Sequence, residues 1–227
     1  MSLVIASSDG LVSRTLGRVR ASYHAAMPHH RLRRYVGDAA DIPTYTSVRE
    51  RLLLFDEATT VLSLSPQACH IVEVGSYLGA SAAVLAEVLR RERPDNGRLY
   101  CIDTWNNDAM SEGVRDTYEQ FRANTSRWQD LITPIRSSST QISLHESLQL
   151  ALVFIDGDHS YEMVTADINR FAPHIIPEGR LILHDHRSKP GVARALGNLL
   201  ESGQWVIQRC VESLVSLRRA PWTTTTS

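Results

Sequence analysis

The chain has 227 residues, of which 43% are hydrophobic and 22% are charged, and its formal net charge is −1. These values are typical of one globular α/β domain with additions. A net charge this close to zero gives no overall positive potential that would attract nucleic acid. No apolar run reaches the roughly 18 residues that a membrane-spanning helix needs. We therefore expect a globular protein that binds neither nucleic acid nor membranes.

The N-terminus and the cysteines indicate a cytoplasmic protein. The first ten residues, MSLVIASSDG, lack the charged segment and the long apolar run of a secretory signal. Cys69, Cys101 and Cys210 are odd in number, far apart and form no CxxC pair. We expect three reduced thiols in the core, with neither a disulfide framework nor a zinc site.

Residues 1–46 are predicted to form a helical and basic extension. Apolar residues recur at helical spacing between positions 12 and 23. The segment PHHRLRRY at residues 28–35 is basic and is expected to be irregular. Three roles remain open for the extension: a solvated surface, a lid that contacts an anionic substrate, or a contact between copies of the chain in a homo-oligomer.

Residues 47–219 are predicted to form the main domain, followed by a flexible tail at residues 220–227. Ser47 and Glu50 make a capping box that begins a helix. Short apolar segments then alternate with helical patterns. Strands are expected at Ile71–Val74, Leu99–Ile102, Ile132–Ile135, Ala151–Ile155 and Arg180–Leu183, and helices at Gly79–Arg91, Val114–Asn124, Tyr161–Phe171 and Val192–Leu200.

Strands without polar alternation are typical of a parallel sheet that is covered on both faces. Two further strands, Trp205–Cys210 and Ser213–Leu217, have no helix between them and predict an antiparallel hairpin. The sequence thus predicts a Rossmann-like, doubly wound, seven-stranded and mostly parallel α/β sheet that ends in this hairpin.

Ligands of a doubly wound sheet bind beyond the carboxyl ends of its strands. All five predicted parallel strands end in hydrogen-bonding groups, which predicts one crevice. These groups are Glu73 with residues 75–79, Asp103, residues 137–140, residues 156–159 and residues 184–186.

The segment GSYLG at residues 75–79 indicates a nucleoside cofactor. Gly75 and Gly79 let the backbone approach a ligand closely. Asp103 ends the next strand, where an acid can accept both ribose hydroxyls. The alternative is a tight turn with an acid that serves solubility alone. The spacing lacks the GxGxxG of a dinucleotide site.

The pattern E-x-G-x-x-x-G at residues 73–79 resembles the first motif of the class I S-adenosylmethionine-dependent methyltransferases. FIDGDHSYEMVTADINRFAPHIIPEGRLILHDH at residues 154–186 and PGVARAL at residues 190–196 resemble the family 24 branch, near the macrocin-type sugar O-methyltransferases and the cephalosporin-hydroxylase-like proteins. The resemblance extends over about Ser47 to Leu217. Glu178 departs from it, because the family often has a second glycine there.

The resemblance implies that Gly75 passes under the methionine part of S-adenosylmethionine, that Asp103 holds the ribose and that residues 136–140 flank the adenine. Tyr77 either lines the site or packs beneath it, and Trp105 either covers the cofactor or is a partly buried surface residue. The expected cofactor-binding residues are Glu73, Gly75, Ser76, Tyr77, Gly79, Ser81, Asp103, Thr104, Trp105, Ser138, Asp156 and His159.

An alcohol acceptor must lose a proton, which a general base or a metal ion can assist. Asp156 and Asp185 end adjacent strands and suit a hard cation such as Mg²⁺. His184 is a third ligand only if the strand bends there, because neighbouring residues of a strand point to opposite faces. His159 suits a base, and we expect it to be catalytic together with Asp156. Alternatively, His159 is part of a helix cap and the acids are strand ends without metal.

We therefore expect an S-adenosylmethionine-dependent methyltransferase that methylates a hydroxyl of a small molecule, a sugar or a natural product, with the help of a divalent metal. One alternative is a nucleotide-dependent oxidoreductase, which the GSYLG segment disfavours. The other is a non-catalytic cofactor-binding or assembly protein, which would not need the acids at Asp156 and Asp185.

Overall fold

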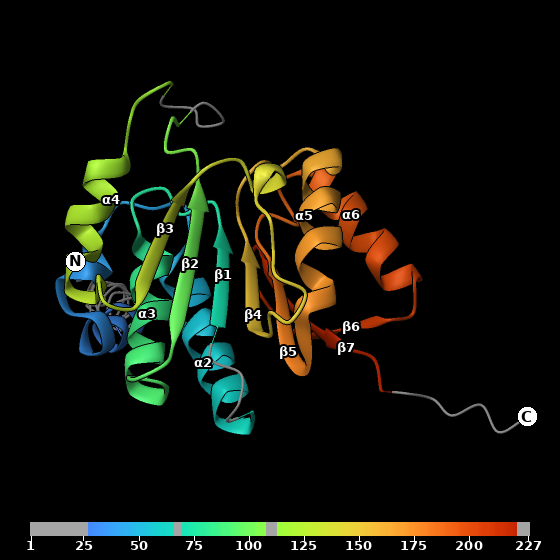
Figure 1. Cartoon of the computed structure of the whole chain (residues 1–227), viewed down its shortest axis with the longest axis horizontal. Helices are drawn as coiled ribbons and strands as arrows, with labels where there is room; N and C mark the ends of the chain where they lie inside the picture. The colour runs from blue at the N-terminus through green and yellow to red at the C-terminus, as the bar shows by residue number, and fades with distance from the viewer. Residues whose placement is uncertain (1–26, 66–69, 108–112, 222–227) are drawn as a thin grey trace, which may run out of the picture.

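The computed structural model describes residues 27–65, 70–107 and 113–221 (Figure 1). The helix predicted between positions 12 and 23, Cys69 and most of the predicted tail lie outside these ranges. Within them, no helix has the length and apolar character needed to cross a membrane.

A seven-stranded sheet organises the molecule, in the order β3-β2-β1-β4-β5-β7-β6. The strands are β1 His70–Val74, β2 Arg98–Asp103, β3 Ile132–Arg136, β4 Leu150–Ile155, β5 Ile175–Leu183, β6 Trp205–Val211 and β7 Leu214–Arg219. The first five are parallel, and β7 is antiparallel to both β5 and β6. The predicted Rossmann-like sheet and its C-terminal hairpin are confirmed. Strand order reverses between β1 and β4, so a ligand crevice is expected there.

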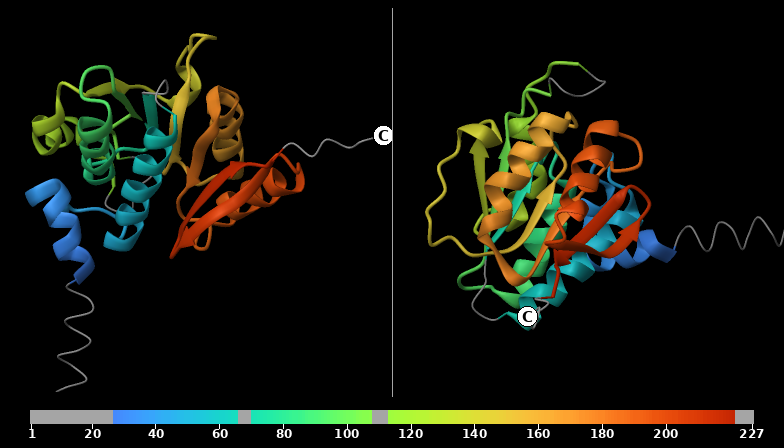
Figure 2. Two further views of the ribbon diagram at one scale, coloured as in Figure 1. Left: turned by 90° about the horizontal axis from the view of Figure 1, so that it is seen from below. Right: turned by 90° about the vertical axis from the view of Figure 1, so that its right-hand side faces the viewer.

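Helices cover both faces of this sheet (Figures 1 and 2). The helices α2 and α3 pack on one face, and α5 and α6 pack on the other. Their bounds are α2 Val48–Leu64, α3 Ala80–Glu92, α4 Tyr118–Thr125, α5 Tyr161–Phe171 and α6 Pro190–Glu201, with short 3₁₀ turns at η1 Gly37–Asp41, η2 Ser126–Trp128, η3 Ser139–Gln141 and η4 Ala172–His174. The predicted capping box begins α2, because Ser47 Oγ accepts from Glu50 N while the Glu50 side chain accepts from Ser47 N.

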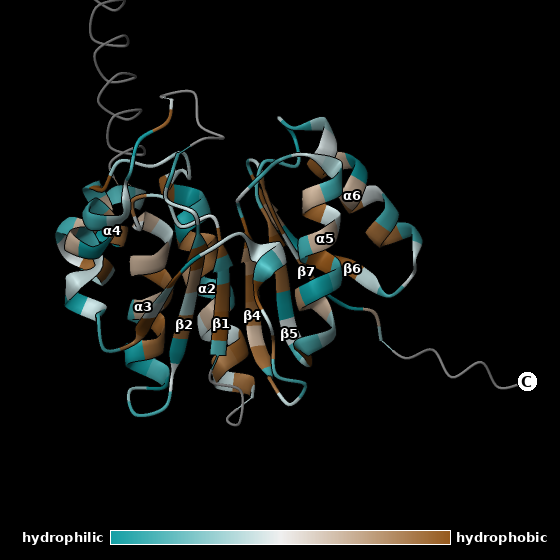
Figure 3. Ribbon diagram, turned by 45° about the horizontal axis from the view of Figure 1, so that its top comes forward, coloured by the Kyte–Doolittle hydropathy of each residue, from teal (hydrophilic) through white to brown (hydrophobic). Residues whose placement is uncertain are grey.

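The middle of the sheet is the most apolar part of the fold. Every residue of β4 is buried, and Figure 3 shows β1 and β4 coloured largely as hydrophobic. Covering both faces removes these side chains from water and leaves the strand ends as the accessible part of the sheet. Polar groups at those ends are therefore within reach of a ligand.

The basic segment at residues 28–35 is helical, so the prediction of an irregular segment is wrong. It belongs to a helix at residues 27–36, and Leu32 and Val36 are buried at its helical spacing of four. The basic side chains face acids on the same surface: Arg31 lies 3.0 Å from Asp56. Similar ion pairs join His29 to Asp41 and Arg33 to Asp38. These contacts place the helix against its neighbours and give no support to a contact with an anionic substrate.

Three smaller expectations are also corrected. The helix α4 begins at Tyr118 rather than at Val114, which is 81% exposed. The strand β5 begins at Ile175 rather than at Arg180. Glu178 therefore lies inside this strand, at an exposed position. Cys101 is buried as predicted, but Cys210 is exposed, because it lies on the edge strand β6.

Candidate active site

A pocket of about 590 Å³ lies beyond the carboxyl ends of the parallel strands. Its size is within the range of roughly 300–1,000 Å³ that suits small ligands. Residues that follow each of the five parallel strands line it, as the sequence predicted. The predicted cofactor residues that line it are Gly75, Ser76, Tyr77, Ser81, Asp103, Thr104, Ser138, Asp156 and His159.

The turn between β1 and α3 is held by Asp103. One carboxylate oxygen of Asp103 accepts hydrogen bonds from the backbone N–H groups of Ser76 and Tyr77, each at 2.8 Å. The other accepts from the N–H of Trp105 at 2.7 Å. The acid that was expected to hold a ribose therefore first fixes the turn that forms the pocket wall. Tyr77 lines the pocket, which decides between its two predicted positions.

The two glycines of this turn serve the packing of the protein itself. A Cβ at Gly75 would lie 2.2 Å from the carbonyl oxygen of Asp156, and one at Gly79 would lie 2.5 Å from the γ-methyl of Thr125. Both residues have a positive φ, +85° and +90°. Gly75 also lines the pocket, whereas Gly79 faces α4 and contributes nothing to the lining.

Glu73 lies beneath the turn and outside the pocket lining. Its side chain is fully buried, Oε2 accepts from Ser76 Oγ at 2.6 Å, and Oε1 has no hydrogen-bond partner among the described residues. Burial raises the pKa of Glu73 to about 7, although hydroxyl and thiol neighbours oppose the shift. Its position therefore suits support of the turn rather than contact with a ligand.

Trp105 takes neither of its two predicted positions, because it is absent from the pocket lining and is fully buried rather than a partly buried surface residue. The side chain is 1% exposed, and its indole nitrogen donates to the carbonyl of Tyr77 at 3.0 Å. Its ring packs against Tyr118 and Phe121, at centroid distances of 5.0 and 4.8 Å. The indole is thus part of the apolar contact with α4, where burial of its large surface is favourable.

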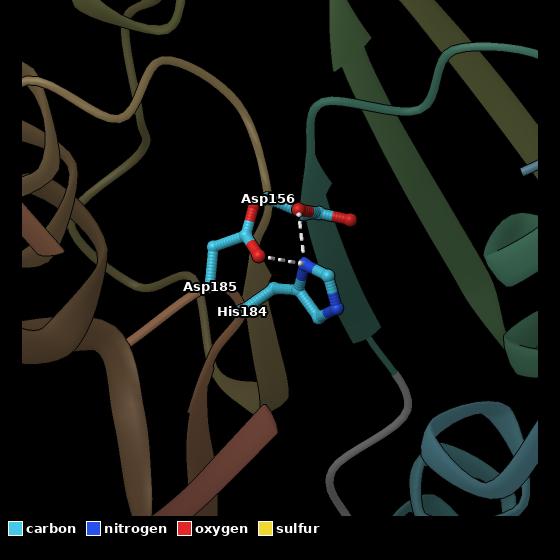
Figure 4. A group of neighbouring side chains, drawn as sticks. All are labelled: Asp156, His184 and Asp185. Carbon is cyan, nitrogen blue, oxygen red and sulfur yellow. Dashed lines mark ion pairs between the residues drawn. The ribbon is translucent and has the colours of Figure 1, made fainter. Parts of the chain in front are cut away.

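Asp156, His184 and Asp185 converge beyond β4 and β5 (Figure 4). His184 Nδ1 lies 3.0 Å from Asp156 Oδ1 and 3.7 Å from Asp185 Oδ1. One potential ligand atom from each residue lies within 4.8 Å of the others. Asp185 has a φ of 61°, so the chain turns directly after β5. This turn is the bend that His184 needs in order to face the same side as Asp185.

Glu50 contacts the other nitrogen of His184, at 3.2 Å from Nε2. Its carboxylate also accepts from the N–H groups of Ser47 and Ser213, each at 2.8 Å. Burial opposes ionisation of both partners, yet these contacts lower the pKa of Glu50 to about 2 and, with Asp156, raise the pKa of His184 to about 10. The sequence identified Glu50 only as a helix cap, because its contact with His184 depends on tertiary structure.

His159 lies on the pocket wall beside Asp185, with Nε2 3.2 Å from Asp185 Oδ2. The helix cap that was considered for it is provided by Ser160, whose Oγ accepts from Met163 N. Asp158 in turn accepts from Ser160 N at 2.7 Å. The imidazole of His159 is therefore left to the pocket.

Several residues of the pocket wall were not predicted from the sequence. Residues 44–46 line the pocket, and Thr46 Oγ1 donates to Asp156 Oδ2 at 3.4 Å. Asp167 and Lys189, the only lysine in the sequence, also line it. A lone lysine four residues after Asp185 was a visible signal, whereas nothing in the sequence marked residues 44–46.

Comparisons with known proteins agree with this fold. The family model described as a methyltransferase domain, family 24, matches residues 72–186, which is over half of the chain. No curated protein matches the sequence.

Several solved structures share the fold. The O-methyltransferase NovP has a TM-score of 0.65 at 15% identity, over 78% of this chain and 82% of that chain. CalS11, a TDP-rhamnose 3′-O-methyltransferase of calicheamicin biosynthesis, has a TM-score of 0.58 at 15% identity, over 85% and 93%. The SAH-bound methyltransferase PaMTH1 of Podospora anserina has a TM-score of 0.57 at 10% identity, over 97% and 100%.

The family match spans the turn after β1, the end of β2 and the strand β4. It also includes Asp156, His184 and Asp185. It thus contains most of the pocket wall as well as the central strands. The chain belongs to the family 24 methyltransferase domains, and it is a class I S-adenosylmethionine-dependent methyltransferase.

Proposed function

We propose that this methyltransferase transfers the methyl group of S-adenosylmethionine to a hydroxyl of a small molecule, with a divalent cation bound by Asp156, His184 and Asp185. The convergence of these three side chains within 4.8 Å beside the pocket carries the proposal. The structural similarity to NovP and CalS11, which are O-methyltransferases by name, supports a hydroxyl acceptor.

The three side chains fit a divalent cation. Two carboxylates provide the oxygen ligands that Mg²⁺ and Mn²⁺ prefer, and an imidazole extends the choice toward Mn²⁺. His184 Nε2 contacts Glu50, so that Nδ1 is directed at the two aspartates. Such a carboxylate on the far nitrogen commonly orients a ligating histidine. Nδ1 must release its proton to act as a ligand.

S-Adenosylmethionine supplies an electrophilic methyl group on a sulfonium, and the cation supplies positive charge that lowers the pKa of a nearby hydroxyl. The turn after β1 and the carboxylate of Asp103 would position the nucleoside, with Ser138 on the wall beside it. Holding both reactants in one orientation is a large part of such catalysis.

In this proposal His159 takes the proton of the acceptor hydroxyl. Asp185 Oδ2 lies 3.2 Å from Nε2 and would favour a proton on that nitrogen, which would leave Nδ1 as the base. Asp185 Oδ1 faces His184 instead, so one aspartate serves both neighbours. Asp156 would hold the cation on the side of β4.

Methyl transfer from radiolabelled S-adenosylmethionine to a panel of sugar and phenolic hydroxyls tests this proposal. Activity should disappear in EDTA and return with Mg²⁺ or Mn²⁺. His159→Ala should lower turnover by about 10²–10⁴, far more than it lowers the affinity for S-adenosylhomocysteine. Full activity in EDTA would refute the metal, and methylation only of compounds without a hydroxyl would refute the acceptor class.

A further inference from the structure

A buried carboxyl group on α5 has an oxygen without a partner. Asp167 is 1% exposed, and its Oδ1 accepts no hydrogen bond from the described part of the chain. Buried polar groups in proteins are nearly always hydrogen-bonded, so each exception asks for an explanation. Asp167 also lines the pocket, where a ligand could provide the missing donor.

The surroundings of Asp167 are fixed by the turn that follows β3. Ser139, in η3, is 5% exposed, lines the pocket and hydrogen-bonds to Asp167. Arg170, one turn further along α5, donates instead to the carbonyls of Thr140 and Ile142. The guanidinium of Arg170 is therefore bound to the backbone of that turn and holds the turn against α5.

The chemistry of Asp167 requires a donor. Burial raises its pKa to about 6, while Ser139 and Arg170 act in the opposite direction. At roughly pH 7.5 the carboxyl is mostly ionised and can only accept hydrogen bonds. A buried carboxylate oxygen without a hydrogen-bond donor destabilises the protein by the full free energy of removing that atom from water. A donor on the bound ligand would remove this penalty.

The position of Asp167 selects among the donors of S-adenosylmethionine. These donors are the ammonium of the methionine part, the ribose hydroxyls and the exocyclic amino group of adenine. Asp103 ends β2, where a ribose is expected, and the proposed reaction centre lies at the ends of β4 and β5. The corner between η3 and α5, which Ser139 and Asp167 share, is left for the base.

We propose that Asp167 accepts a hydrogen bond from the exocyclic amino group of the cofactor's adenine and thereby selects adenine over a base that carries a carbonyl at that position. The inference rests on the proposed position of the cofactor in this pocket. Asp167 thus determines the specificity for the cofactor's base and is separate from the groups that act on the methyl acceptor.

Calorimetry at about pH 7.5 with S-adenosylhomocysteine and its hypoxanthine counterpart, S-inosylhomocysteine, tests the assignment. The wild-type protein should bind the adenine compound about 10- to 100-fold more tightly, as expected for one hydrogen bond to a charged group. In Asp167→Asn the side-chain amide can donate as well as accept. The preference should then fall to within about threefold.

Asp158→Asn is the matched control. It removes a carboxylate from the same pocket, but one whose oxygen already accepts from Ser160 N. This variant should keep the wild-type preference, because a general loss of negative charge does not distinguish the two bases. A loss of preference in Asp158→Asn equal to that in Asp167→Asn would overturn the assignment.

Further outcomes separate this inference from the proposed function. A wild-type protein that binds both compounds equally would refute the role of Asp167 without any variant. If Asp167→Asn weakens S-adenosylhomocysteine but not 5′-methylthioadenosine, which lacks the amino-acid part, Asp167 pairs with the ammonium and the inference is wrong. Absence of any binding of S-adenosylhomocysteine to the wild type would instead refute the proposed position of the cofactor.

Discussion

At the scale of single residues, Glu73 links the pocket wall to the pH dependence of stability. Its pKa is raised from 4.5 to about 7 in the folded protein. Between these values the unfolded chain has lost the proton while the folded protein keeps it. The free energy of unfolding therefore falls as the pH rises through this window.

Glu73→Gln should remove that contribution, because the amide stays neutral. The loss of stability from about pH 5 to about pH 8 should be smaller in the variant, by up to roughly 3 kcal/mol. Asp167 shifts in the same direction and remains in both proteins. Urea unfolding at the two pH values measures the difference. Identical pH dependence in both proteins would show that Glu73 ionises normally despite its burial.

Glu50 combines a helix cap with a contact to His184, and the two roles can be separated. Glu50→Leu should weaken Mn²⁺ binding about 10- to 100-fold, because His184 loses the group that orients it. Ser47→Ala is the control, since it removes the cap at a cost of about 1 kcal/mol but leaves the contact with His184. Mn²⁺ titration by electron paramagnetic resonance measures both. Equal losses in the two variants would mean that Glu50 acts only through the helix.

At the scale of elements, the turn between β1 and α3 depends on its two glycines. Gly75, Gly79 and Gly113 have nearly the same φ, between +85° and +90°, but different surroundings. Among the described residues, a Cβ would meet backbone at Gly75, a side chain at Gly79 and nothing within 4 Å at Gly113. The three positions therefore separate backbone strain from steric contact.

Substitution by alanine should destabilise the protein in the order Gly75 most, then Gly79, then Gly113. Gly113→Ala measures the strain of a positive φ alone, about 1–2 kcal/mol. Gly79→Ala adds a contact with Thr125 that a rotated side chain can relieve, whereas the Asp156 carbonyl at Gly75 cannot move freely. Thermal unfolding of the three variants gives the order. A Gly75→Ala variant as stable as Gly113→Ala would contradict the observed close approach.

The same turn shows what the sequence can predict. Its position follows from a local pattern, an apolar strand followed by GSYLG, and the structure places it there. Which way each residue faces is set by tertiary packing. The Cα of Gly79 and the indole of Trp105 therefore face α4 instead of the pocket. Glu50 was missed for the same reason. The helix at residues 27–36 was predictable from the spacing of Leu32 and Val36, but its many charges obscured that pattern.

At the scale of the whole molecule, segments that are distant in the sequence meet around Asp156, His184 and Asp185. Glu50 at the start of α2 contacts both His184, after β5, and Ser213, in the turn between β6 and β7. The hydroxyl of Thr46, just before α2, donates a hydrogen bond to Asp156. The N-terminal part and the C-terminal hairpin thus both support the site. The division of the chain at residues 46 and 219 remains a prediction.

The central claim is that Asp156, His184 and Asp185 together bind a divalent cation, and Mn²⁺ titration of wild-type protein and Asp185→Asn tests it most directly. Wild-type protein should bind one Mn²⁺ per chain, with Mg²⁺ in competition. Asp185→Asn should lose that binding yet keep its affinity for S-adenosylhomocysteine, because Asp185 lies apart from the turn after β1. Absence of Mn²⁺ binding to the wild type, or equal binding to the variant, would contradict the account.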